Sequence, residues 1–156
     1  MMRMRDSQRQ KLYNWEARFA PEGEHLSLDE CAALVKKVVR HYGVPMPEVK
    51  DGRGTRWARG GKRYISLPTW ARSEEVVIHE ASHCVVDHYI GYCGVASHGP
   101  EYVWLYTNTL AWHFGARVSE LRSSARYVGK LKIRKPERYE ALRKKFRAMQ
   151  KMRKMV

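Results

Sequence analysis

Two histidines four residues apart, in the segment IHEASHCVVDH (residues 78–88), constrain this chain more than any other feature of its sequence. On an α-helix, His79 and His83 project from the same side about one turn apart, so both imidazoles can reach one small ion. Glu80 lies beside the first histidine and can approach the open side of that ion. We therefore expect a helix over residues 73–89 that carries a metal site.

Zinc-dependent peptide hydrolysis requires this division of residue types. Imidazoles hold the cation, while a carboxylate that is not a ligand accepts a proton from the attacking water. Such a site usually takes three protein ligands and leaves one position open. The best candidate for the third ligand is His98, 15 residues after His83 and across a glycine-containing loop. Glu101 is the alternative, which a thermolysin-like site would use.

HEASH at residues 79–83 and HGPEY at residues 98–102 together resemble the catalytic core of the SprT-like zinc metallopeptidases. In that family H-E-x-x-H is followed by a third histidine in an H-G-P-E-F-like segment. The resemblance covers roughly residues 53–115, because those enzymes also place a small sheet before the active-site helix. It implies three Zn²⁺ ligands and one general base, carried over by position: His79, His83, His98 and, as the base, Glu80.

This chain departs from the family pattern in two ways. Tyr102 stands where the family has phenylalanine, which is a mild aromatic change. No cysteine-rich zinc ribbon follows the core, so a DNA role assigned to that ribbon does not carry over.

The positions after the motif separate this chain from other H-E-x-x-H families. A metzincin requires glycine at position 86 and histidine at position 89, where Val86 and Tyr89 stand, so that family is excluded. Phage-type repressor-cleaving and radiation-response regulators often carry histidine or acidic residues just beyond the motif. Asp87 and His88 occupy such positions, so membership of this class stays an open hypothesis. Asp87 can also orient a ligand imidazole. Three further residues can donate a hydrogen bond to a tetrahedral intermediate: Tyr64, Tyr106 and His113.

The remaining pattern predicts an α+β fold, a minimal zincin-like domain with a small antiparallel sheet of about three strands packed on the active-site helix. Residues 44–68 alternate short β-favouring runs with Pro and Gly. Gly60 and Gly61 are the expected hairpin tip, which places Trp57 opposite Tyr64. Further helices are expected over residues 6–19, 27–43, 100–114, 118–128 and 136–156.

Positive charge gathers at the C-terminal end of the chain. The net charge is +14, and residues 122–156 carry fourteen Lys and Arg against two Glu, so +12 lies there. We therefore divide the chain into a catalytic domain, residues 1–133, and a basic amphipathic helix, residues 134–156. This helix can dock on the body, bind the phosphates of DNA, or bind an acidic protein or anionic membrane. Its apolar stripe consists of Tyr139, Leu142, Phe146 and Met149.

The sequence favours a cytoplasmic protein. It has no run of about 18 uncharged apolar residues, so no transmembrane segment is expected. The basic N-terminus leads into polar residues rather than the apolar run of a secretory signal. Cys31, Cys84 and Cys93 form no C-x-x-C pair and are expected to be reduced.

These features predict a zinc metallopeptidase that hydrolyses peptide bonds in protein or peptide substrates, with DNA as a second partner of the basic end. Two alternatives stay open. One is a nucleic-acid-binding protein in which the zinc site is structural or vestigial. The other is a phage-type regulatory peptidase that cleaves one specific protein.

Overall fold

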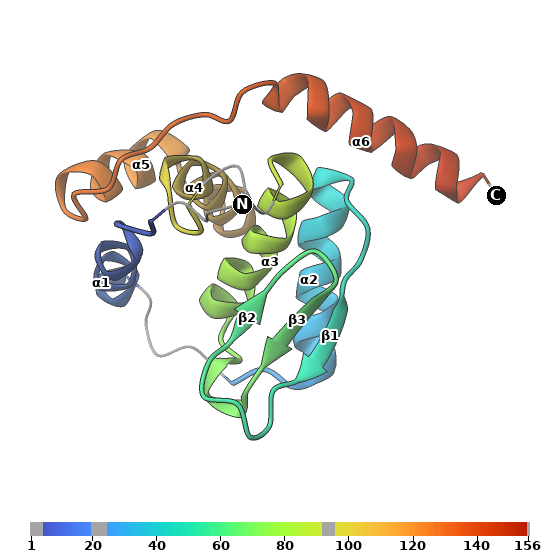
Figure 1. The fold of residues 1–156 in the computed structure, drawn as a ribbon, viewed down its shortest axis with the longest axis horizontal. Helices are drawn as coiled ribbons and strands as arrows, with labels where there is room; N and C mark the ends of the chain where they lie inside the picture. The colour runs from blue at the N-terminus through green and yellow to red at the C-terminus, as the bar shows by residue number, and fades with distance from the viewer. Residues whose placement is uncertain (1–4, 20–24, 92–95, 156) are drawn as a thin grey trace.

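The computed structural model describes residues 5–19, 25–91 and 96–155, within which six α-helices and a three-stranded sheet form one α+β body (Figure 1). This confirms the expected α+β class. No helix in these ranges is long and apolar enough to cross a membrane. The elements are α1 (Arg9–Phe19), α2 (Leu28–Tyr42), β1 (Glu48–Asp51), β2 (Arg59–Gly60), β3 (Tyr64–Leu67), the 3₁₀ helix η1 (Thr69–Ala71), α3 (Glu74–Tyr89), α4 (Pro100–Phe114), α5 (Val118–Tyr127) and α6 (Tyr139–Lys154).

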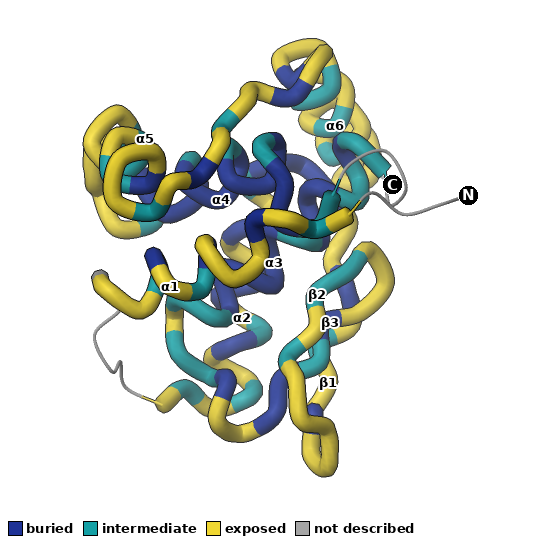
Figure 2. Tube along the Cα trace, turned by 60° about the vertical axis from the view of Figure 1, so that its left-hand side comes forward, coloured by how far each residue is buried: buried dark blue, intermediate teal, exposed yellow. Residues whose placement is uncertain are grey.

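The core surrounds α3, the helix of the histidine motif. Figure 2 shows α3 and α4 with most of their residues buried, whereas α5 and α6 are largely exposed. Cys31 and Cys84 are buried free thiols, as expected, and Cys93 lies outside the described residues.

The two ends of α2 are fixed by the residues that the sequence indicated. Ser27 and Glu30 form a capping box: the Glu30 amide donates to Ser27 Oγ at 3.1 Å, and the Ser27 amide donates to Glu30 Oε2 at 2.7 Å. Gly43 ends the helix at φ 79°. A Cβ at Gly43 would also lie 2.8 Å from the backbone of Phe146, so this glycine lets α6 approach α2 closely.

The sheet differs from the expected antiparallel one. Its order is β1-β3-β2, with β1 parallel and β2 antiparallel to β3. This arrangement buries the central strand and brings the edge strand into close contact with α3. The central strand β3 carries Ile65 and Leu67, both fully buried, and β2 takes the edge against α3, where Gly60 meets the backbone of Glu80.

The predicted hairpin register is also wrong. Arg59 pairs with Ser66 and Gly60 with Ile65, so residues 61–63 connect β2 to β3 and Trp57 does not face Tyr64. The burial of the β3 side chains sets this register, because a shift by one residue would turn them to the opposite face of the sheet.

Gly60→Ala is expected to lower the free energy of unfolding by at least about 1–3 kcal/mol, because the added methyl group would displace the backbone of β2 or α3. A Cβ at Gly60 would lie 2.2 Å from the carbonyl oxygen of Glu80. Gly61→Ala is the matched control, since its Cβ would meet its nearest atom, Asp87 Oδ2, at 3.6 Å. Urea unfolding of both variants measures the difference. Equal stability of the two would contradict the close packing of β2 on α3.

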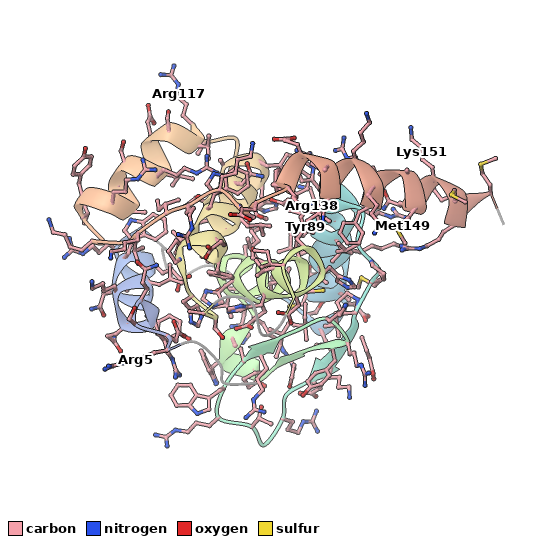
Figure 3. The ribbon with its side chains drawn as sticks, turned by 45° about the horizontal axis from the view of Figure 1, so that its top comes forward. Arg5, Tyr89, Arg117, Arg138, Met149 and Lys151 are labelled. Carbon is pink, nitrogen blue, oxygen red and sulfur yellow. The ribbon has the colours of Figure 1, made fainter. Side chains whose placement is uncertain are left out.

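The C-terminal helix α6 docks by the first part of its apolar stripe. Phe146 stacks on Tyr89 of α3 with ring centroids 5.0 Å apart, and Tyr139 lies 5.6 Å from the same ring. Further along, Met149 is 38% exposed and Met152 is 68% exposed, as α6 extends past the body (Figure 1). Lys151 projects away from the body (Figure 3). The helix is thus anchored at its N-terminal half and open to solvent at its C-terminal half.

Two histidines beneath α6 are kept neutral by their surroundings. Burial lowers the pKa of His41 to about 4, and the neighbouring Arg143 and Arg147 of α6 act in the same direction. Burial lowers the pKa of His88 to about 4 as well, with further lowering by the charges of Lys62 and Arg153.

Docking of α6 is therefore expected to weaken as the pH falls from about 6.5 toward 4. In this pH range both imidazoles stay neutral while α6 is docked, because their pKa values are about 4, but they become protonated when the helix is released. Acid therefore favours release. Hydrogen exchange in α6 at pH 7.5 and 4.5, corrected for intrinsic rates, measures the effect. The double variant His41→Gln, His88→Gln should show a smaller pH effect, and an equal one would assign the acid response to other groups.

Candidate metal centre and cleft

Three imidazoles converge at the centre of the molecule. His79 and His83 project from α3, and His98 lies in the turn before α4. Their Nε2 atoms are 3.2 Å apart for His79 and His83, 3.2 Å for His79 and His98, and 3.1 Å for His83 and His98. The three predicted ligands thus come together. Within the described chain they form a group of potential metal-binding side chains with the spacing of a metal site.

The spacing of the three nitrogens fits a tetrahedral cation. Imidazole nitrogens about 2.0–2.1 Å from zinc are separated by roughly 3.3 Å in that geometry. His79 is 5% exposed and His98 is 6% exposed. Burial lowers the pKa of His98; burial also acts to lower that of His79, but the carboxylate of Glu16 outweighs it, so the pKa of His79 is raised. Neutral imidazole is the form that binds a metal.

Two carboxylates fix the orientation of these rings. The Nδ1–H of His79 donates to Glu16 at 2.6 Å, and the Nδ1–H of His98 donates to Asp6 at 2.7 Å. Because an ionised carboxylate only accepts hydrogen bonds, the proton of each ring lies on Nδ1. The lone pairs of both Nε2 atoms are therefore directed at each other, an arrangement that a cation between them stabilises.

Sequence reasoning did not identify Asp6 or Glu16. A signal for Glu16 was present: it follows Leu12 by four residues, and Leu12 is fully buried, so a carboxylate lies on the inward face of α1. Asp6 precedes the helix and gave no such signal. Gln8 secures this segment, since its side-chain amide donates to the His98 carbonyl at 3.1 Å and accepts from the Lys132 amide at 2.6 Å. Asp87, the expected orienting residue, lines the same cleft, and its role stays a prediction.

Asp6→Asn and Glu16→Gln are each expected to weaken metal binding by about 10–100-fold, the usual effect of removing a partner of a ligating histidine. The neutral amide keeps the size of the side chain and loses the charge that orients the imidazole. Competition with a chromogenic chelator measures the affinity. Glu120→Gln, on the exposed helix α5, is the control and should bind zinc like the unmodified chain. Unchanged affinity in both site variants would exclude the proposed orienting role.

Glu80 lies next to the histidine cluster on the buried part of α3. It is 7% exposed and lines the cleft beside His79 and His83. Burial raises the pKa of Glu80. A carboxylate with a raised pKa takes up a proton more readily, which suits a general base.

The three candidates for an oxyanion donor lie at different places in the structure. Tyr64 lines the cleft. Tyr106 is fully buried against the His79 ring, with centroids 5.5 Å apart. His113 is not among the residues that line the cleft and lies 3.3 Å from Glu74. The structure therefore does not place it as an oxyanion donor. Tyr13 of α1, which the sequence did not single out, lines the cleft within 5.4 Å of the His98 ring.

The HGPEY segment holds the site together through its last two residues. Glu101 is not in the metal-binding group: its Oε1 accepts hydrogen bonds from Arg134 Nε at 2.9 Å and Nη2 at 2.5 Å. Tyr102 stacks on the ring of His83, with centroids 4.3 Å apart, and its hydroxyl donates to the His79 carbonyl at 2.9 Å. The tyrosine thus adds a hydrogen bond that phenylalanine cannot make.

A cleft of about 1050 Å³ opens onto the histidine cluster. Residues 57–64, which comprise β2 and the connection to β3, form one wall, and α3 forms the floor. Asp6, Arg9 and Tyr13 close it from the side of α1. The edge strand β2 therefore borders the candidate metal centre.

No protein-family model matches this chain. Comparison with curated proteins finds no significant match, and comparison with solved structures finds none either. The resemblance to SprT-like enzymes thus rests on the motif residues, and the interpretation of the site rests on its geometry.

Proposed function

We propose that this chain is a zinc metallopeptidase of the SprT-like kind that hydrolyses peptide bonds in protein substrates. One observation carries the proposal: three imidazoles, two of them buried, direct their Nε2 atoms at a common point, within 3.2 Å of one another. A buried cluster of this kind is costly unless a cation binds between the nitrogens. Imidazole ligands suit several transition metals, and a three-histidine site with an adjacent glutamate is typical of catalytic zinc.

The chain supplies the groups that peptide hydrolysis needs. A divalent cation at the three histidines supplies a Lewis acid that polarises the scissile carbonyl and acidifies a water molecule. Glu80 accepts the proton of this water and passes it to the leaving amine. Tyr13 and Tyr64 line the cleft and are the candidates to donate a hydrogen bond to the tetrahedral oxygen.

The edge strand β2 can align the substrate. It pairs with β3 on one side only, so its other edge offers backbone donors and acceptors along the cleft. An extended peptide that pairs with this edge lies across the histidine cluster. The substrate is therefore proposed to be an unfolded segment rather than a folded surface.

Metal removal and return tests this function. Purified protein is incubated with an unfolded protein substrate, with chelator, and with chelator followed by one equivalent of zinc. Cleavage should stop on chelation and return with zinc. Cleavage that persists without metal, or a zinc-loaded protein that cleaves neither unfolded proteins nor a peptide library, would contradict the proposal.

A polyanion is the second proposed partner, through α6. In the part of the chain that the structure describes, no Lys or Arg of α6 forms an ion pair with a carboxylate. DNA binding by this helix is expected to weaken steeply with salt. Changing Lys144, Lys145 and Lys151 to glutamine should flatten the salt dependence, whereas the same change at the exposed Lys11, Lys36 and Lys50 should not. Equal slopes in the two triple variants would exclude α6 as the contact.

The nucleic-acid-binding alternative is separated from the enzyme by Glu80. If zinc has a purely structural role, Glu80→Gln changes no function of the chain. The buried free thiols Cys31 and Cys84 are compatible with the reducing cytoplasm proposed for this protein.

A further inference from the structure

Unpaired positive charge surrounds the mouth of the cleft. Arg9, Arg59, Lys62 and Arg63 all line it and all are exposed. None of these four forms an ion pair with a carboxylate in the described chain. We call them the cationic rim. Three belong to the β2 wall and Arg9 belongs to α1, so the rim flanks the histidine cluster from two sides.

Unlike the residues of the cationic rim, two other arginines of the body are paired with a carboxylate. Arg53 pairs with Asp51 at 3.2 Å and Arg72 pairs with the same carboxylate at 3.0 Å. Residues 1–121 as a whole carry sixteen Lys and Arg against fourteen Asp and Glu. Four exposed cations that form no ion pair in the described chain thus lie around one concavity, and such a cluster attracts an anion there.

The carboxylates that line the cleft do not form ion pairs with the cationic rim in the described chain. Asp6 accepts from His98, and Glu80 is buried beside the histidines. Asp87 lies on α3 at the side of Gly61. Glu80 and Asp87 thus lie on the floor and Asp6 is held by a histidine, whereas the rim residues are exposed.

The same wall carries exposed aromatic surface. Trp57 is 54% exposed and Tyr64 is 42% exposed. Because side chains alternate along an extended peptide, one that pairs with β2 presents alternate residues to Arg59 and to these rings. The wall thus suits a ligand with both carboxylate and apolar side chains, which describes a peptide better than a nucleic acid whose charge lies on its backbone.

We infer that the cleft selects acidic peptide segments, with Asp or Glu side chains near the scissile bond bound by Arg59, Lys62 and Arg63 on one side and by Arg9 on the other. This inference rests on the proposed peptidase function for the cleavage step. The binding preference itself depends only on the cationic rim.

Three peptides of equal length test it: an acidic one, its Asn and Gln counterpart, and a Lys counterpart. Their affinity for the Glu80→Gln variant is measured by fluorescence anisotropy, and their cleavage by the unmodified chain as kcat/KM. The acidic peptide should bind at least about 10-fold more tightly than the neutral one at low salt, with a smaller ratio at high salt.

The double variant Arg59→Gln, Lys62→Gln, in the Glu80→Gln background, should lose most of this ratio while zinc content stays unchanged. Arg53→Gln, outside the cleft, is the control and should keep the full ratio. Equal affinity for the acidic and neutral peptides would overturn the inference. So would a single-stranded oligonucleotide of equal charge that binds more tightly than the acidic peptide and loses affinity in the same double variant.

The two failures are distinguishable. Charge-dependent binding without cleavage of any peptide would retain the rim and remove the peptidase function. Cleavage of all three peptides with equal kcat/KM would retain the peptidase function and remove the rim.

Discussion

Replacing Glu80 by glutamine is expected to reduce kcat/KM for peptide hydrolysis by at least about 10²–10⁴-fold, the usual contribution of a positioned general base. The amide has nearly the same shape as the carboxylate and cannot accept the proton of the attacking water. Because Glu80 is not one of the three converging ligands, zinc content should remain about one per chain. Cleavage of an unfolded protein substrate and metal analysis of the same sample measure both quantities.

The control for this variant is Glu120→Gln, which removes an equal charge from the surface of α5. It should cleave substrate at the normal rate. Loss of zinc in Glu80→Gln would mean that the carboxylate is a ligand, and full activity in that variant would remove Glu80 from the mechanism.

His98→Ala is expected to have the largest effect on the metal. The change leaves two protein ligands from one helix, so zinc affinity should fall by more than the roughly 100-fold limit expected for the Asp6 and Glu16 variants. Metal content after dialysis against a competing chelator should drop from about one to near zero. His113→Ala is the matched control, because His113 lies outside the cluster and pairs with Glu74.

Unchanged zinc content in His98→Ala would show that another group completes the site. Glu101 would then be the first residue to test, although its Oε1 is held by Arg134 in this structure. The double variant Glu101→Gln, Arg134→Gln separates its role in the ion pair from any role at the metal.

The local features of this fold could be predicted from the sequence because short-range patterns determine them. The capping box at Ser27 and Glu30, the left-handed Gly43 and the apolar spacing of α6 each depend on residues a few positions apart. The convergence of His79 and His83 follows from helical geometry alone. His98 was predictable from the need for a third ligand together with the HGPEY segment.

The order of the strands could not be predicted in the same way. The β2 strand lies against α3 because Gly60 permits contact with the backbone of Glu80, 20 residues later in the sequence. The sequence shows a glycine pair, which equally suits a tight hairpin tip. Only the tertiary contact decides between the two, so the antiparallel sheet and the Trp57 to Tyr64 pair were wrong.

The role of α1 was missed for a related reason. Glu16 of α1 and Asp6, which precedes this helix, reach the histidines across separations of 63 and 92 residues. Patterns within one helix do not indicate which distant ring a carboxylate will meet. The structure makes α1 and the residues just before it part of the candidate metal centre: together they orient two ligands and close one side of the cleft.

The central claim is that three imidazoles share one cation, and anomalous X-ray diffraction at the zinc absorption edge tests it most directly. Crystals of the purified chain should show one anomalous peak about 2.0–2.1 Å from the Nε2 atoms of His79, His83 and His98. A peak bound by other residues, or rings that diverge in a crystal grown with excess zinc, would contradict it.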